Sequence, residues 1–539
     1  MKKVTKYSFL PVVLSFLIGS CNDLDVPVTT QITPDVYPQD SSQFVASAGV
    51  VYAALRGNYA HDFFFAQTLS TDEGIMPARG GNWYDNQGYR VMHYHEWTPD
   101  RSWSWGCWDW LSRVISYDNQ TMYILRRNMP EGAFKSRMMA ELRMVRALAY
   151  YYMMDLFGDV PIVTEYGDFE PKAQTPRAEV FTFIEKEILE VIPDLTTNVS
   201  PATYGYPTQY MAYSLLAKMY LNAGYYTGTQ RYNDCIAACD KVISSGRYTL
   251  ADRNEYLKLF YPDNGPGTKE FIFAIPFDPT YVPLSGTSGY LYRARYDVPR
   301  SLRAKFGLPF TPSAPMSTLP EHYALFDDPN DVRNGQWLTG LQYLNDGVTP
   351  VKVTTTNKGY NQFYSGPDAG AAYTYHVELT PNIVLRQDSL MFDAGNDEIS
   401  WNMGYRNIKF YPDATSTTRN QNNDMPVFRY ADILLMKAEA LLRGGTATLG
   451  HTALSLVNMV REKRTTSPAW TGVTLDALYN ERGREFTYEL WRRNDMIRFG
   501  KYEDKWGFKV DSDPRKRIFP IPTGALVKNP KLVQNPGYN

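Results

Sequence analysis

A stretch rich in aromatic and polar side chains, residues 70–97, has the residue types of a sugar-binding site. It reads STDEGIMPARGGNWYDNQGYRVMHYHEW. An aromatic plane can stack on the C–H face of a pyranose ring, and amide, carboxylate and guanidinium groups can bond its hydroxyls. Gly80 and Gly81 leave the backbone free to present Trp83 outward. The candidate contacts in this stretch are Trp83, Tyr84, Asn82, Arg79, Asp85 and Asn86.

Aromatic residues are abundant throughout the chain, with 41 Tyr and 11 Trp. We expect most of the tyrosines in the core. We also expect core positions for four tryptophans that sit close to a predicted helix, namely Trp103, Trp105, Trp108 and Trp110. Weaker candidates for ligand contact lie further along the chain: Tyr290, Tyr292, Trp337 and Tyr343.

Two groups of residues could bind a metal ion, but neither has the spacing of a complete site. His93, His95 and Glu96 lie in a strand-like stretch, where we expect ordinary surface residues and not metal ligands. The acidic run at 327–331 could hold a hard cation such as Ca²⁺, but its irregular spacing favours a polar turn. We therefore predict no metal and no cofactor.

The cysteines after residue 21 are Cys107, Cys235 and Cys239. Cys235 and Cys239 lie four residues apart on a predicted helix, but no further His or Cys completes a zinc site. We therefore expect these cysteines to be small, buried hydrophobic residues. A Gly-x-Ser-x-Gly motif and a glycine-rich phosphate loop are both absent from the sequence. These observations argue against common hydrolases and nucleotide enzymes.

The N-terminus has the pattern of a bacterial lipoprotein signal over residues 1–20. Lys2, Lys3 and Lys6 precede an apolar stretch, 9–18, and Ile-Gly-Ser then leads to Cys21 in the manner of a lipobox. We predict that Cys21 becomes the lipidated N-terminus; the alternative is a chance cysteine in an ordinary secretory signal. The proline-containing stretch 21–40 is predicted to be a tether.

The composition indicates a folded globular protein. Apolar residues make up 44% of the 539 residues and charged residues 21%, with a formal net charge of −2. This charge argues against nucleic-acid binding. Beyond the signal, no apolar run approaches the ~18 residues that a membrane span needs.

The elements that must position these side chains are helices arranged in pairs. Apolar residues recur at helical spacing, and each run stops at glycine or a similar breaker. Two of the pairs resemble each other, which suggests tetratricopeptide-like repeats, although a non-repetitive bundle remains open. We predict helices over 141–157, 179–192, 211–224, 233–245, 430–443, 453–464 and 475–499.

Residues 277–425 have a different character. They are rich in Gly, Pro, Thr, Asn and Tyr and contain only short apolar runs. We therefore predict a mainly α protein in which a helical-repeat scaffold carries a large insert of loops and short strands. Loops of this extent are usually functional.

Six segments, in order along the chain, resemble the RagB/SusD family of outer-membrane glycan-binding lipoproteins. They are AELRMVRALAYYYMMDLFGDVPIV (140–163), AYSLLAKMYLNAG (212–224), IAACDKVISSGRYTL (236–250), RYADILLMKAEALLR (429–443), ERGREFTYELWRRNDMIRFG (481–500) and IFPIPTGALVKNPKLVQNPGY (518–538). The charged helix within 481–500 carries opposite charges at i, i+3 and i+4, which favours structural pairing over acid–base catalysis.

The resemblance implies a non-enzymatic, surface-exposed lipoprotein of the outer membrane. It implies a helical scaffold over 41–276 and 426–539, with a binding face built from loop 70–97 and the insert 277–425. It also implies that the protein delivers oligo- or polysaccharide to a TonB-dependent transporter. Asp23 and Asp25 after the lipidated cysteine fit surface exposure. Two alternatives remain open: a glycoside hydrolase, which needs two carboxylates across a cleft, and a repeat scaffold for a peptide or protein.

Overall fold

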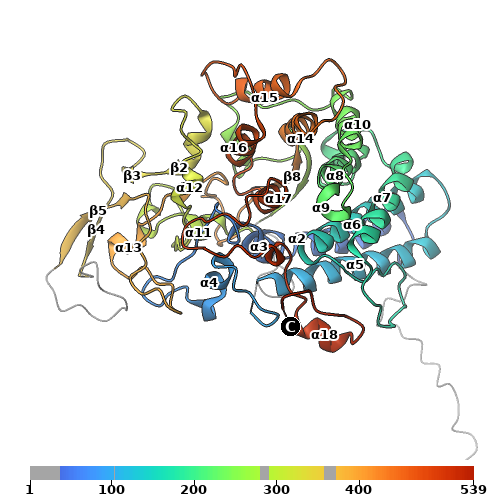
Figure 1. Cartoon of the computed structure of the whole chain (residues 1–539), viewed down its shortest axis with the longest axis horizontal. Coiled ribbons are helices and arrows are strands. Elements are labelled where there is room, and N and C mark those ends of the chain that lie inside the picture. The colour runs from blue at the N-terminus through green and yellow to red at the C-terminus, as the bar shows by residue number, and fades with distance from the viewer. Residues whose placement is uncertain (1–36, 102, 279–289, 357–371, 539) are drawn as a thin grey trace, which may run out of the picture.

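The computed structural model describes residues 37–101, 103–278, 290–356 and 372–538. The predicted signal and Cys21 lie outside these residues. The fold is mainly helical, and short strands are concentrated on one side (Figure 1). Among the described residues, the helices are either too short or too polar to span a bilayer.

The scaffold consists of helices that pack antiparallel in sequence order, as Figure 1 shows at the right. Helix α5 packs on α6, α6 on α7, α8 on α10, α10 on α14 and α14 on α15. This continuous stacking of pairs confirms the predicted helical-repeat scaffold. The bounds are α2 Ser41–Arg56, α3 Phe64–Thr68, α4 Gly88–His93, α5 Ser104–Asn128, α6 Ala133–Phe157, α7 Arg177–Val191, α8 Gln209–Leu221, α9 Ala223–Thr227, α10 Tyr232–Ile243, α14 Tyr430–Leu442, α15 Ala453–Glu462, α16 Leu475–Glu485, α17 Arg492–Arg498 and α18 Thr523–Lys528.

Local signals in the sequence begin and end these helices. The Thr208 side chain caps α8 by accepting a hydrogen bond from the backbone of Met211, and Thr452 and Ser455 form a reciprocal capping box at α15. Helix α6 ends at Gly158, whose φ of 76° lies in the region that favours glycine. The helices predicted between 141 and 464 therefore agree with the structure to within a few residues, except that α6 begins two turns before the predicted 141.

Two strands close the base of the insert. β1 (Phe271–Ile275) pairs antiparallel with β8 (Met425–Arg429), and both are fully buried. The segment between them contains the short elements that its composition predicts. They are α11 Arg293–Asp297, α12 Pro320–Tyr323, α13 Glu398–Trp401, β2 Trp337–Leu338, β3 Gly340–Leu341, β4 Lys352–Thr355, β5 Tyr373–His376, β6 Glu378–Leu379 and β7 Arg406–Asn407.

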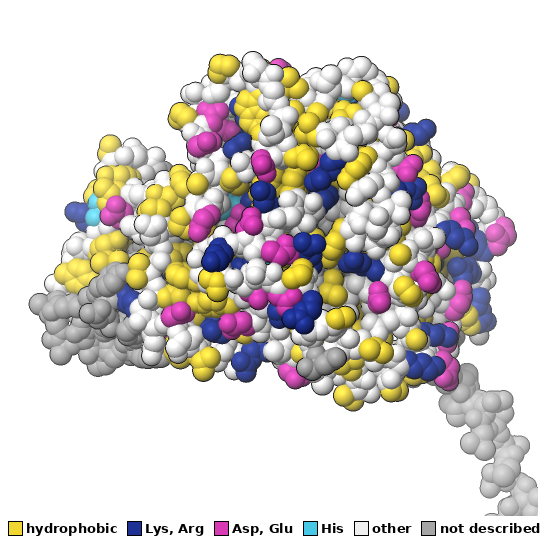
Figure 2. All heavy atoms as spheres, in the orientation of Figure 1, with side chains coloured by type: hydrophobic (Ala, Val, Ile, Leu, Met, Phe, Trp, Pro, Cys, Tyr) yellow, Lys and Arg dark blue, Asp and Glu magenta, His cyan; other side chains and the backbone are white. Residues whose placement is uncertain are grey.

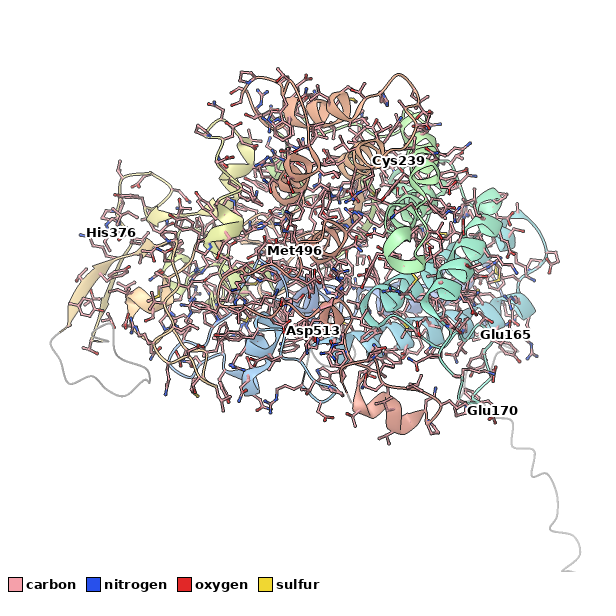
Figure 3. All side chains as sticks on the ribbon, viewed as in Figure 1. Glu165, Glu170, Cys239, His376, Met496 and Asp513 are labelled. Atoms are coloured by element: carbon pink, nitrogen blue, oxygen red, sulfur yellow. The ribbon has the colours of Figure 1, made fainter. Side chains whose placement is uncertain are left out.

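The insert and the helical pairs occupy opposite ends of the molecule. His376 of β5 lies at the outer end of the insert, whereas Cys239 of α10 lies among the helices (Figure 3). Cys107, Cys235 and Cys239 are free and buried, as predicted. On the face shown in Figure 2, hydrophobic side chains gather over the insert, and charged side chains are spread over the helical pairs.

The predicted long helix over 475–499 is wrong, because the chain breaks between α16 and α17. Tyr488 and Leu490 have φ values of 60° and 67°, which no α-helix allows. Tertiary contacts hold the break: the Tyr488 backbone N–H donates to Glu73 Oε1 at 3.1 Å, and Arg492 makes two bonds to the Asp72 carboxylate, at 2.7 and 2.5 Å. The break thus connects the C-terminal helices to the base of stretch 70–97.

A buried charge network surrounds this break. Glu485 lies between Arg464, Arg429 and Arg333, at nitrogen–oxygen distances of 3.0, 2.9 and 3.1 Å. Burial alone would raise the pKa of Glu481, but the guanidinium groups of Arg333, which is 2.8 Å away, Arg484 and Arg461 together outweigh burial and lower that pKa to about 2. These charges pair against neighbouring segments, as the sequence predicts, and their role is structural.

Candidate functional site

Only the tip of stretch 70–97 reaches the surface. Residues 70–80 are buried without exception, whereas residues 81–88 are partly or fully exposed. The tip leads into α4. The predicted loop is therefore a short exposed turn on a buried base, and the base is fixed by the Asp72 and Glu73 contacts described above.

The tip is anchored to the insert by one carboxylate. The backbone N–H groups of Gly80 and Gly81 donate to the two oxygens of Asp393, at 2.8 and 2.7 Å. Ala78 and the segment 392–394 exchange two further backbone bonds, of 2.9 and 3.0 Å. Gly80 and Gly81 have φ values of 61° and 82°, so a side chain at either position would be strained. These bonds fix the N-terminal end of the tip to the insert, and its C-terminal end continues directly into α4.

Four non-glycine residues of the tip also adopt the left-handed backbone conformation. The φ values are 63° at Trp83, 41° at Asp85, 50° at Asn86 and 67° at Gln87. Such conformations cost of the order of 1–3 kcal/mol each and concentrate at functional sites. The surrounding structure therefore holds the side chains of this turn in a costly arrangement, which favours a binding role for the turn.

Aromatic rings from the tip and from the insert come together next to this turn. The Trp83 and Tyr296 rings meet edge to face, with centroids 5.9 Å apart. Tyr292, at the start of α11, lies 6.4 Å from Tyr296 and stacks on Tyr290 at 4.9 Å, with 12° between the ring planes. Trp83, Tyr290 and Tyr292 are partly exposed. The structure thus brings three of the candidate contacts, Trp83, Tyr290 and Tyr292, into one cluster.

Arg295 lies at the centre of this cluster and is not among the contacts predicted from the sequence. Its guanidinium carbon is 5.2 Å from the Trp83 ring centroid, 5.7 Å from Tyr292 and 5.9 Å from Tyr296. The guanidinium makes no hydrogen bond or ion pair within the part of the chain that the structure describes, and its Nε atom is buried. The terminal N–H groups of this partly exposed side chain are therefore available to a ligand.

The other polar candidates of the tip stay at the surface. Asn82 is exposed and donates to the Arg79 carbonyl at 2.9 Å. The partly exposed Tyr84 hydroxyl accepts a bond from Gln87 at 3.0 Å. Asp85 and Asn86 are exposed, one and two residues after Tyr84. All four lie within four residues of Trp83, where they could reach the same ligand.

Two predicted contacts are buried away from this cluster, and a third, Tyr343, meets His376 at 5.2 Å instead. Arg79 is completely buried, and its guanidinium binds the Ser400 carbonyl and the Ser317 hydroxyl. Trp337 is 7% exposed and packs against Phe326 and Tyr323 at 5.1 and 5.6 Å. Neither side chain presents a face to solvent, so we correct both predictions: each of these residues supports the fold.

Other expectations for this region need correction too. Trp105 is 58% exposed on α5, although Trp108 and Trp110 are core residues as predicted. His93 and His95 lie at and after the end of α4, not in a strand, and both are buried, so the plain-surface interpretation is wrong. Burial lowers the pKa of His93 to about 3, and this ring is therefore neutral.

The remaining metal candidates are accounted for by protein contacts. Asp328 accepts hydrogen bonds from Thr465 and Ser467 at 2.7 and 2.8 Å, and Asp331 pairs with Arg333 at 2.6 Å. This acidic run is a polar turn, as predicted. Across residues 37–101, 103–278, 290–356 and 372–538, no three side chains of ligand type are grouped to hold a metal ion.

Partly exposed aromatic rings beside a guanidinium without a hydrogen bond among the described residues, brought together by the tip and the insert, are features typical of a ligand-binding protein. The chain belongs to the SusD family: the sequence model of that family matches residues 214–538. A second model of the same kind, described as starch-binding and associating with the outer membrane, matches residues 27–221. The family is associated with the outer membrane, and its members are non-catalytic carbohydrate-binding proteins.

Relatives match along the whole chain. The starch-binding protein SusD of Bacteroides thetaiotaomicron is 26% identical over 98% of this chain and 97% of its own length. SusD-like protein P38 of Formosa agariphila is 23% identical over the full length of both chains. The RagB/SusD resemblance seen in the sequence motifs is therefore confirmed.

Solved structures share the fold. A laminarin-binding SusD-like protein superposes with a TM-score of 0.70, covers 93% of this chain and 100% of its own, and is 22% identical. Surface glycan-binding protein A from Bacteroides thetaiotaomicron, in complex with laminarihexaose, has a TM-score of 0.68 and 20% identity, with coverage of 92% and 99%. At these identities the likeness establishes the fold alone.

Proposed function

We propose that this protein binds an oligo- or polysaccharide on the cell surface, without cleaving it, through the cluster of Trp83, Tyr290, Tyr292 and Arg295. The observation that carries this proposal is the unpartnered guanidinium of Arg295 among partly exposed rings. Aromatic faces stack on pyranose C–H groups, and a guanidinium donates to sugar hydroxyls. The exposed Asn82, Asp85 and Asn86 add acceptors and donors beside the rings. Glycan binding by relatives supports the proposal.

The purified protein should be retarded in native gels that contain one or more polysaccharides of a panel, because an open, rigid cluster needs no closure to bind. The panel should include starch and laminarin, the ligands named for relatives. The retained polysaccharide should release no reducing ends on prolonged incubation. Release of reducing ends would favour the hydrolase alternative. No retardation by any glycan, with capture of a peptide instead, would favour the peptide-binding scaffold.

We also propose that Cys21 anchors the chain by lipid to the outer face of the outer membrane, where the protein hands its glycan to a TonB-dependent transporter. The lipobox and the acidic residues Asp23 and Asp25 support the anchor and surface exposure. The family's association with the outer membrane supports the location. The family resemblance supports the transporter as partner.

Cys21→Ala should move the protein from the membrane fraction to the soluble fraction, because the fold itself offers no spanning helix among the described residues. Mild detergent extracts of wild-type membranes should yield the protein together with a large β-barrel partner. Cys21→Ser is the matched control and should behave like Cys21→Ala. Unchanged fractionation would contradict the anchor, and repeated recovery of the protein alone would contradict the transporter.

A further inference from the structure

A pocket lies between the insert and the helical scaffold, and none of its lining residues belongs to the Trp83 cluster. It has a volume of about 460 Å³, within the ~300–1,000 Å³ that is usual for small-ligand sites. Its walls come from the acidic turn after α12, from α15 and the segment that follows it, and from α16. Helices α15 and α16 lie at the top of Figure 1, above α4 and α11. The residues that matter are Asp327, Asp328, Arg461, Trp470, Asn480 and Arg484.

Trp470 forms a preorganised aromatic wall of this pocket. Asn458 fixes its backbone from both sides: the Trp470 N–H donates to Asn458 Oδ1 at 3.0 Å, and Asn458 Nδ2 donates to the Trp470 carbonyl at 2.9 Å. The Arg461 guanidinium lies 4.1 Å from the indole centroid. The ring stays partly exposed. A ring held in this way loses little conformational freedom when a ligand stacks on it.

Two polar side chains of the pocket have hydrogen-bonding groups that find no partner among the described residues. Arg461 is 94% buried; its Nη1 atom donates to Glu481 at 3.4 Å, but its Nε atom has no acceptor. Native structures rarely leave a buried donor unsatisfied. The Asn480 amide is partly exposed and makes no side-chain hydrogen bond within the part of the chain that the structure describes. The pocket therefore offers a donor from Arg461 and both a donor and an acceptor from Asn480.

The charges around the pocket balance and thus indicate a neutral ligand. The lining of the pocket includes two carboxylates, Asp327 and Asp328, and two guanidinium groups, Arg461 and Arg484. Asp328 is already bonded by Thr465 and Ser467, while Asp327 has only a long ion pair of 3.7 Å with Arg484. An anionic ligand would meet as many carboxylates as guanidinium groups. A neutral polyhydroxyl ligand suits an aromatic wall with donors and acceptors of both kinds.

We propose that this pocket is a second carbohydrate site, which takes a neutral sugar unit with its ring on Trp470 and its hydroxyls on Asn480 and Arg461. The proposal rests on the proposed function, since it assumes that the chain is a glycan-binding protein. Two sites on one rigid body would bind a long polysaccharide more tightly than a short oligosaccharide, through effective concentration.

Fluorine NMR of the full chain labelled with 5-fluorotryptophan would test this. The Trp83 and Trp470 resonances can be assigned with Trp83→Phe and Trp470→Phe, and buried Trp491 reports on global change. The probes are laminarihexaose, maltohexaose, cellohexaose, xylohexaose and mannohexaose, with an anionic heparin hexasaccharide in a separate arm. We expect a neutral hexasaccharide to shift the Trp470 resonance in the wild type and equally in Trp83→Ala.

Asn480→Ala should weaken the response at Trp470 by about tenfold and leave the response at Trp83 unchanged, because it removes hydrogen bonds from one site only. A shift at Trp83 without any shift at Trp470 would overturn the second site and leave the proposed function intact. A response of Trp470 to the heparin hexasaccharide alone would overturn the neutral ligand class. If no neutral probe shifts either the Trp83 or the Trp470 resonance, both the second site and the proposed function would be contradicted.

Discussion

Replacing Trp83 by alanine should weaken binding of the retained polysaccharide by about thirtyfold or more. The indole is partly exposed on a turn that Asp393 holds rigid, and it lies 5.2 Å from the free Arg295 guanidinium. A desolvated aromatic anchor contributes about 2 kcal/mol or more to binding, which corresponds to this factor. Affinity electrophoresis or calorimetry with the retained glycan measures the loss. Arg295→Met, which keeps the apolar stem, should weaken binding as well.

Thermal unfolding separates a binding role for Trp83 from a structural one. The melting temperature of Trp83→Ala should change little, since the ring is only partly packed. Trp108→Ala is the matched control: Trp108 is 6% exposed and meets Phe157 at 5.0 Å, and loss of a buried tryptophan costs roughly 3–5 kcal/mol of stability. An early-melting Trp83→Ala protein that binds glycan normally would mean that Trp83 is a core residue.

Glu485→Gln should lower the free energy of unfolding by about 3–5 kcal/mol. The Glu485 carboxylate is fully buried between Arg464, Arg429 and Arg333, and a neutral amide would leave three buried guanidinium groups short of one counter-charge. Burial tends to raise the pKa of Glu485, but the three guanidinium groups hold it well below its ordinary value, so the group is charged. Urea denaturation monitored by two independent probes measures the change.

The surface pair of Lys463 and Asp252 provides the control for that experiment. Its charged atoms are 2.5 Å apart, but the side chains are 45% and 68% exposed. Asp252→Asn should therefore change stability by less than about 1 kcal/mol. Glu485→Gln protein that remains folded should bind glycan normally, because Glu485 lies in the network and not among the Trp83 rings. Equal effects of the two substitutions would contradict the structural role of the network.

The scaffold could be predicted from the sequence because its signals are local. Apolar periodicity and terminators such as Gly158 fix the helical pairs within a few residues. The prediction of a single helix over 475–499 is wrong because contacts with distant residues, and not local signals, decide the structure there. The local pattern there is helical, but Glu73 and Asp72, more than 400 residues away along the chain, hold the break at 486–491. Local propensity carries no information on such distant partners.

The candidate site could be predicted only in part for the same reason. Trp83 stands out because it follows two glycines, and Tyr292 because it is aromatic in a loop-rich segment. Arg79 has the residue type of a ligand contact, but its guanidinium is buried and donates hydrogen bonds to the carbonyl of Ser400 and the hydroxyl of Ser317. Arg295 is important because the fold brings it to Trp83. The alternation of Tyr and Arg over 290–296 is the one signal that could have indicated it.

The bonds that hold the base and tip of stretch 70–97 have a consequence for the order of folding. Arg492 and Asp72 are 420 residues apart along the chain, and Asp393 and Gly80 are 313 apart. Contacts of such sequence separation close large loops and form late, whereas the helical pairs need only near neighbours. A growing or newly exported chain can therefore build its helices early. It acquires affinity for ligand only when its last quarter has docked.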